Sequence, residues 1–201
     1  FFLKHLARFL LLFESVKAKG SFLDNKRVIV TAAPHQSGKD EYLMILMILA
    51  LDIEVCYLSA KWTMRRIPIP FIKPKDIDNQ GIPWPLGWLQ EIVFRKFGAI
   101  PVDRKGNSGQ YDSVVQELLK RDSFLLIITP EGRFDATRFR SSFLYLAKEL
   151  EAEVMPVQID YEHDTLQFLE SLNLDGSEDE VIQRLRYCFD GVKGRKKRFK
   201  A

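Results

Sequence analysis

The chain has 201 residues, 46% of them apolar, and a formal net charge of +3. This length and apolar content suffice for one domain with its own core, and so small a net charge gives no support to nucleic-acid binding through a broad basic face. Only Cys56 and Cys188 are present, which excludes a disulfide framework, and no spacing of His, Cys, Asp and Glu indicates a metal site.

Residues 1–20 place Phe and Leu around Lys4, His5 and Arg8. This pattern predicts an amphipathic helix in a membrane interface, and a terminal helix packed on the core fits it equally well. The longest uninterrupted apolar run, residues 43–51, is shorter than the ~20 residues that a membrane span needs. We therefore expect membrane association that is peripheral or monotopic, on the cytoplasmic face.

Apolar, β-branched runs alternate with segments of helical periodicity along the rest of the chain. This alternation predicts an α/β fold, a single domain whose largely parallel sheet is flanked by helices. The last predicted helix has Ser177 as its cap, with Glu180 reaching back to it. The predicted strands are residues 27–31, 53–58, 99–102, 124–129 and 154–159, and the predicted helices are residues 39–51, 86–97, 109–121, 139–150 and 178–189.

Two segments interrupt the alternation. Residues 67–85 hold five prolines, which exclude a helix or a central strand and predict either a lid that touches the membrane or a packed surface excursion. Six of the last nine residues are basic. We expect this tail to attract anionic lipid headgroups, with a solvated tail as the alternative.

A histidine follows the first predicted strand, in the sequence TAAPHQSGKD of residues 31–40. Loops at the carboxyl ends of parallel strands are where α/β proteins place their sites. His35 and Asp40 would point about 140° apart on a regular helix, but Pro34 and Gly38 bend the chain, so the carboxylate can fold back onto the imidazole. Such a pair can take a proton from a hydroxyl. A surface or capping role for His35 is the alternative.

Two further loops, residues 98–104 and 129–133, also follow predicted strands. Arg104 could grip a phosphate through two parallel hydrogen bonds, and Gly132 would let backbone amides approach an anion. An ion pair of Asp103 with Arg104 and an ordinary Pro-Glu-Gly turn are the alternatives. The order of the three loops along the chain favours one shared site.

Together these blocks resemble the glycerolipid acyltransferases, specifically the 1-acyl-glycerol-3-phosphate acyltransferase family. The resemblance spans roughly residues 27–161 and implies an acyltransferase domain over residues 21–190, between the helix of residues 1–20 and the basic tail of residues 191–201. The matching blocks, in the family's order, are His35 and Asp40 with Ser37 between them, residues 98–104, residues 130–132 and residues 155–157.

The resemblance implies transfer of a fatty acyl group from a thioester, on coenzyme A or acyl carrier protein, to the hydroxyl of a lysophospholipid such as 1-acyl-glycerol-3-phosphate. His35 would be the general base, oriented by Asp40, without a covalent acyl-enzyme. Neither a cofactor nor a metal is expected, and the partners would be the two substrates and a membrane surface, with no nucleic acid. The implied substrate-binding residues are Ser37, Lys61, Arg104, Glu131, Gly132 and Arg133.

The chain departs from the family in its third block, which usually continues Gly-Thr-Arg. Here Gly132 is followed by Arg133 and Phe134. Of Arg133, Arg138 and Arg140, we expect Arg133 to contact an acceptor phosphate because it is nearest to Gly132. Two other functions stay open: the same fold acylating an acceptor without a phosphate, and a non-enzymatic module for lipid binding or membrane tethering.

Overall fold

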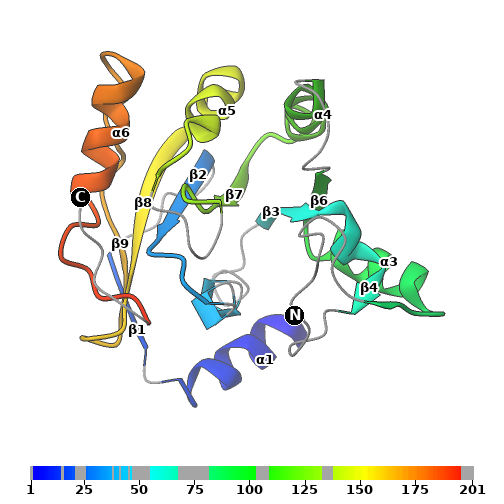
Figure 1. The fold of residues 1–201 in the computed structure, drawn as a ribbon. Coiled ribbons are helices and arrows are strands. Elements are labelled where there is room, and N and C mark those ends of the chain that lie inside the picture. Colours follow the sequence, from blue (N-terminus) through cyan, green and yellow to red (C-terminus); the bar gives the residue numbers. More distant parts are fainter. Residues whose placement is uncertain are drawn as a thin grey trace. The chain divides into compact units, whose positions relative to one another are not determined.

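The chain forms two compact units, Phe1–Glu54 with Asp122–Ala201, and Val55–Arg121 (Figure 1). The computed structural model describes residues 2–14, 16–20, 26–37, 39–40, 42–44, 46, 55–67, 82–102, 109–132 and 138–195. Strands of the first unit are hydrogen-bonded in the order β1 (Lys17–Lys19), β9 (Thr165–Phe168), β8 (Glu153–Asp160), β2 (Arg27–Ala33) and β7 (Phe124–Ile128).

The centre of this sheet is β2 (Arg27–Ala33), which is parallel to β7 (Phe124–Ile128) on one side and to β8 (Glu153–Asp160) on the other. Residues 28–30 are fully buried, as expected of a parallel strand covered on both faces. The pairing register brings the carboxyl ends of all three strands to one edge of the sheet.

Two strands at the other side of β8 were not predicted. The strand β9 (Thr165–Phe168) returns antiparallel to β8 after a tight turn, and β1 (Lys17–Lys19) pairs parallel with β9. The three residues of β1 are all exposed. A polar edge strand this short has no apolar alternation, so sequence periodicity could not reveal it.

Helix α5 (Ser142–Leu150) packs on β2 and buries the side chains of residues 143, 146, 147 and 150, the spacing of a single apolar stripe. The prediction that this helix starts at residue 139 is wrong. Phe139 packs edge-on against Phe189, and the backbone N–H of Arg140 donates to the carbonyl of Pro130 at 2.8 Å. These contacts hold both residues outside the helix.

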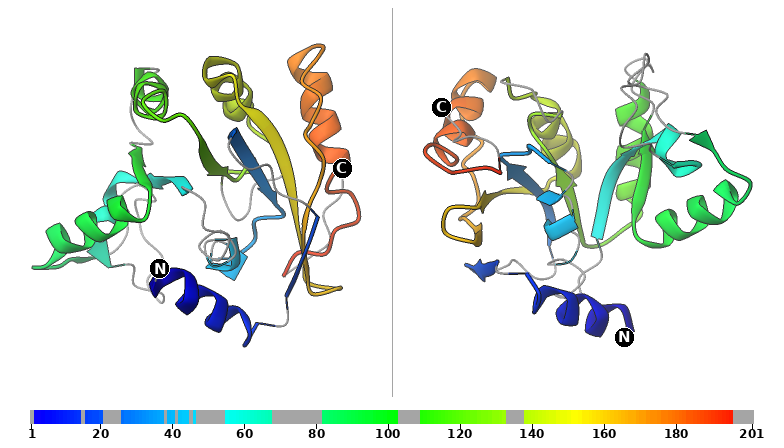
Figure 2. Two further views of the ribbon diagram at one scale, coloured as in Figure 1. Left: turned by 180° about the vertical axis from the view of Figure 1, so that it is seen from behind. Right: turned by 60° about the horizontal axis from the view of Figure 1, so that its bottom comes forward.

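Helix α6 (Glu178–Tyr187) begins with the predicted capping box. The backbone N–H of Glu180 donates to Ser177 Oγ at 3.4 Å, and the backbone N–H of Ser177 donates to Glu180 Oε2 at 2.7 Å. The helix buries Val181 and Leu185, one turn apart. Figure 2 shows α5 and α6 next to each other in both views.

The N-terminal helix α1 (Phe2–Leu11) covers half of the segment predicted to be amphipathic. Ala7 is buried, whereas Leu6 and Phe9 are exposed. Of the predicted helix 39–51, residues 39–40, 42–44 and 46 are helical, and the rest lies outside the described residues. Within the part of the chain that the structure describes, no helix combines the length and the apolar character needed to cross a bilayer.

The second unit contains a parallel pair of strands and short elements around it. Gly98, at φ +83°, ends the turn between α3 (Gly87–Lys96) and β6 (Ala99–Val102), where an added Cβ would lie 1.8 Å from the carbonyl oxygen of Val55. Of the proline-rich segment, residues 68–81 lie outside the described residues, so the predicted lid is not described. The elements are β3 (Val55–Ala60) paired with β6 (Ala99–Val102), η1 (Lys61–Met64), the antiparallel pair β4 (Arg66–Ile67) and β5 (Ile82–Pro83), α3 (Gly87–Lys96) and α4 (Gly109–Leu118).

The predicted fold class is confirmed: this is an α/β protein with a mainly parallel sheet flanked by helices. The division into residues 1–20, 21–190 and 191–201 stays a prediction.

Candidate functional site

The loop after β2 places His35 at the carboxyl edge of the sheet. His35 is 5% exposed, and its backbone N–H donates to Oε2 of Glu131 at 2.7 Å. Glu131, in the turn after β7, is buried as well. The two residues meet because β2 and β7 are parallel neighbours whose ends lie at the same edge. The structure therefore brings the first and third predicted loops together.

Asp40 lies beside His35 and is 1% exposed. Its Oδ2 is 3.8 Å from His35 Nδ1, within ion-pair range but longer than a hydrogen bond. The backbone N–H groups of Gln36 and Ser37 each donate to this oxygen at 2.7 Å, and Ser37 Oγ donates to Oδ1 at 3.2 Å. These bonds fix the carboxylate next to the imidazole, and they engage the hydroxyl of Ser37, which was predicted to bind substrate.

The same bonds form the start of a helix. The Asp40 carboxylate accepts the backbone N–H of Ser37, and the backbone N–H of Asp40 donates to the Ser37 carbonyl at 3.1 Å. Ser37 is therefore the N-cap of the helix, and Asp40 is its third residue. Asp40 therefore has a structural role of its own.

Tyr161, immediately after β8, is a further member of the site that sequence reasoning missed. Its hydroxyl donates to Asp40 Oδ1 at 2.6 Å. Burial, followed by the hydrogen bond to Asp40, raises the pKa of Tyr161 well above the ordinary range, so the phenol remains a protonated donor. The signal available in the sequence was its position, since a hydroxyl residue two places after the predicted strand 154–159 belongs to the same sheet edge.

The chain near its C-terminus also packs on this loop. Gly194 is buried, and a Cβ added there would meet both Gln36 and Pro34 at 2.7 Å. The carbonyl of Lys193 accepts the backbone N–H of Tyr161 at 2.8 Å. Lys193 and Gly194, in the predicted basic tail, thus pack against the site. Residues 196–201 lie outside the described residues.

Gly132 follows Glu131 in the turn after β7, with φ +68°. Its backbone N–H donates to the Thr129 carbonyl at 3.0 Å, and an added Cβ would lie 3.2 Å from Nε of Arg140. The exposed Arg140 therefore lies against the predicted anion-binding turn. Arg138 is exposed too.

The remaining predicted residues are Lys61, Arg104 and Arg133. Lys61 opens η1 in the second unit and is exposed. Arg104 and Arg133 lie outside the described residues, so their proposed phosphate contacts stay predictions.

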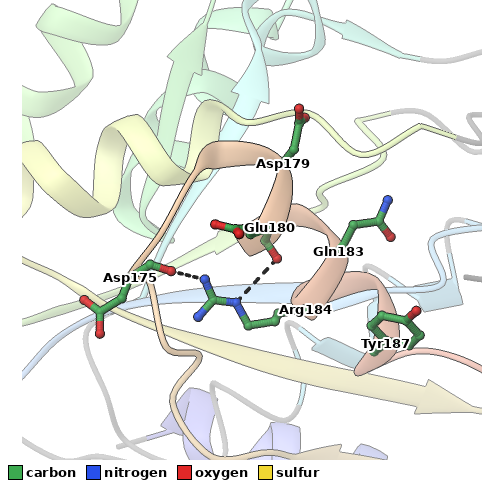
Figure 3. Close-up of a pocket in the computed structure, with 6 residues that line it drawn as sticks. All are labelled: Asp175, Asp179, Glu180, Gln183, Arg184 and Tyr187. Carbon is green, nitrogen blue, oxygen red and sulfur yellow. Dashed lines mark hydrogen bonds between the residues drawn. The ribbon is translucent and has the colours of Figure 1, made fainter.

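A surface pocket along α6 is a separate feature (Figure 3). There Arg184 donates to the backbone carbonyls of Asp175 and Glu180, and none of the predicted site residues lines the pocket. Its polar groups stabilise the helix start, so we do not assign it a catalytic role. Across the described ranges, no group of three or more His, Cys, Asp or Glu side chains is placed to hold a metal.

Residues 85–160 match the family described as Acyltransferase. No curated protein matches the sequence. The matched segment runs from just before α3 to the end of β8 and includes Glu131 and Gly132, whereas His35, Asp40 and Tyr161 lie outside it. Residues 85–160 are therefore similar to the acyltransferase family that includes the glycerolipid acyltransferases, and this match supports acyl transfer in general as the activity.

Proposed function

We propose that this acyltransferase moves a fatty acyl group from acyl-coenzyme A or acyl carrier protein to the hydroxyl of a lysophospholipid such as 1-acyl-glycerol-3-phosphate. The observation that carries the proposal is the buried pair of His35 and Asp40, 3.8 Å apart at the carboxyl edge of the sheet. A capping role explains Asp40 but not why an imidazole is buried beside it.

In the proposed reaction, Nε2 of His35 takes the proton of the acceptor hydroxyl while that oxygen attacks the thioester carbonyl. The C–S bond then breaks, and the imidazolium returns the proton to the departing thiolate. Asp40, on the Nδ1 side, orients the ring and stabilises its charged form. A separation of 3.8 Å is compatible with this role, because catalytic hydrogen bonds are often long without substrate and tighten in its presence.

The acceptor phosphate is proposed to bind at the turn of Glu131 and Gly132. Glu131 already accepts the backbone N–H of His35, so we assign it the task of holding the His35 loop. A cation is then needed for the phosphate, and Arg140 lies against Gly132. Arg104 and Arg133 are further candidates from the sequence.

We further propose that α1 holds the enzyme at the cytoplasmic face of a membrane. The exposed apolar side chains of this region include Phe9, Leu12 and Phe13, which suits an interfacial helix. An ion pair of 2.9 Å between Glu14 and Lys39 joins the turn after α1 to the residue next to Asp40. The helix would thereby keep the site close to lipid substrates.

The decisive experiment measures thiol release from long-chain acyl-coenzyme A, and from acyl carrier protein, with lysophosphatidate as acceptor. We expect His35→Ala to lower the acceptor-dependent rate by roughly 10²–10⁴-fold, the range of general-base catalysis. His163→Ala is the matched control, because His163 is exposed and pairs with Asp160 at 2.7 Å, and it should keep full activity.

Two other outcomes would select the alternatives. Activity only with acceptors that lack a phosphate would favour the first alternative, in which the changed third block alters the specificity for the acceptor. Binding to liposomes without turnover of any donor would favour a tethering module, in which Ser37 and Asp40 serve only to start their helix.

A further inference from the structure

We infer that Tyr161 is a positioning residue that acts on His35 through Asp40. The inference rests on the proposed function. It is carried by the 2.6 Å hydrogen bond that the Tyr161 hydroxyl donates to Oδ1 of Asp40.

The hydrogen bonds to Asp40 divide into local and distant ones. Gln36 and Ser37, which donate to the carboxylate, are its near neighbours in the chain, so their bonds tie Asp40 to its own turn. Tyr161 is 121 residues away and stands at the end of β8, the strand beside β2. Its bond therefore fixes the turn, and with it the carboxylate that faces His35, relative to the sheet.

The position of Tyr161 itself is set by its backbone. Its N–H donates to the Lys193 carbonyl at 2.8 Å, and β8 precedes it directly. Tyr161→Phe removes the hydroxyl while it leaves this anchor and the ring unchanged. The phenol is also protonated throughout the usual assay range, since its pKa is raised, so its contribution should not depend on pH there.

The test is a double-mutant cycle of Tyr161→Phe and Asp40→Asn, read out as kcat and KM for acceptor-dependent thiol release. We expect Tyr161→Phe to lower kcat by roughly tenfold, the size of one hydrogen bond to a charged group, with KM for the acceptor within about twofold. In the Asp40→Asn background the same change should have a much smaller effect, because the remaining amide oxygen is neutral and the charged group that the hydroxyl positions is gone. Tyr187→Phe, at an exposed tyrosine, is the control.

The outcomes separate this inference from the proposed function. An active wild-type protein with an unchanged Tyr161→Phe variant overturns the inference alone, and so does an equal effect of the change in both backgrounds. A wild-type protein that transfers no acyl group overturns both. A thermal unfolding scan of each variant shows whether a lost rate reflects lost folding.

A second inference, independent of the first, concerns the outer face of α3. Trp88, the most exposed of its apolar side chains, is 56% exposed. The opposite face packs inward at Gly87, where a Cβ would meet the Arg65 carbonyl at 2.8 Å. The helix thus turns its apolar side away from its own unit. The exposed apolar side chains here are Ile82, Leu86, Trp88, Leu89, Ile92 and Val93.

On α3 itself, the apolar residues Trp88, Leu89, Ile92 and Val93 lie within an arc of about 140° at 100° per residue, and Lys96 lies within the same arc. The surrounding charge is mostly positive. Glu91 is paired with both Arg65 and Arg95. Across the described residues 61–67 and 82–98, Glu91 is the one acidic residue. The basic residues in these ranges are Lys61, Arg65, Arg66, Arg95 and Lys96.

We propose that this face docks on an anionic lipid bilayer. An apolar patch with an interfacial tryptophan and surrounding cations fits lipid tails and anionic headgroups together. A face that instead joined two copies of the chain would need no such excess of positive charge, because like charges would then oppose each other.

The test uses vesicles of phosphatidylglycerol and phosphatidylcholine with brominated acyl chains, which quench nearby tryptophan. The chain has three tryptophans, Trp62, Trp84 and Trp88. We expect wild-type fluorescence to be quenched on binding and most of the quenched component to be absent from Trp88→Phe at the same bound fraction. Equal quenching in both proteins, no binding, or a concentration-dependent dimer that Ile92→Ser abolishes would overturn the proposal.

Discussion

The buried carboxylate of Glu131 accepts the backbone N–H of His35 at 2.7 Å. The bond joins two loops that are 96 residues apart in the chain and that leave neighbouring parallel strands. Because it involves the backbone of His35 and not the imidazole, it fixes the path of the loop. It gives Glu131 a role that does not require contact with substrate.

From this bond we predict different effects of two substitutions at residue 131. Glu131→Ala leaves a buried N–H of His35 without its acceptor and should lower the free energy of unfolding by about 1–3 kcal/mol, together with the rate of acyl transfer. Glu131→Gln keeps an acceptor oxygen and should lose less of both. Urea denaturation and thiol release measure the two quantities. Equal losses for both variants would mean that the negative charge, and not the hydrogen bond, matters.

Gly98 provides a second prediction, about stability. Gly98 and Gly191 both have positive φ, but an added Cβ would lie 1.8 Å from the backbone oxygen of Val55 at Gly98 and would meet nothing within 4 Å at Gly191. We expect Gly191→Ala to cost about 1–2 kcal/mol, the strain of a left-handed L-residue, and Gly98→Ala roughly 1–3 kcal/mol more, because backbone must move. Chemical denaturation of both variants tests this, and similar midpoints would contradict it.

From the hydrogen bonds of Glu180 we predict that the free energy of unfolding depends on pH. Hydrogen bonds from the Ser177 backbone N–H, and then from its hydroxyl, hold the pKa of Glu180 below its ordinary value. A lowered folded-state pKa stabilises the protein above the pKa of the unfolded chain, and this contribution is lost as pH falls through the folded-state pKa. Glu180→Gln should therefore have a lower urea midpoint than wild type at neutral pH, and the difference should shrink in acid. A difference that persists unchanged near pH 3 would refute the linkage.

Much of this arrangement was predictable from local patterns. The apolar runs of β2, β7 and β8 and the box of Ser177 with Glu180 are periodic or motif signals, and the structure contains them. The edge strand β1 and the late start of α5 were not predictable, since both depend on tertiary contacts that override local preference. For the site, the sequence indicated that His35 and Glu131 would share an edge. It did not indicate Tyr161, because the partner of a side chain depends on register and rotamer.

The last prediction concerns Arg140 and the binding of the acceptor phosphate. Its guanidinium lies against Gly132, in the turn that also holds the His35 loop, whereas the exposed Arg138 is the matched cation two residues away. If Arg140 binds the acceptor phosphate, Arg140→Ala should raise KM for lysophosphatidate by roughly 10- to 100-fold, the loss of a charge-assisted hydrogen bond, and should leave KM unchanged for an acceptor without phosphate. Arg138→Ala should change neither value. Steady-state kinetics with both acceptors measures this selectivity. An equal rise for the two acceptors would show that Arg140 supports the fold of the turn, and phosphate recognition would then fall to Arg104 or Arg133.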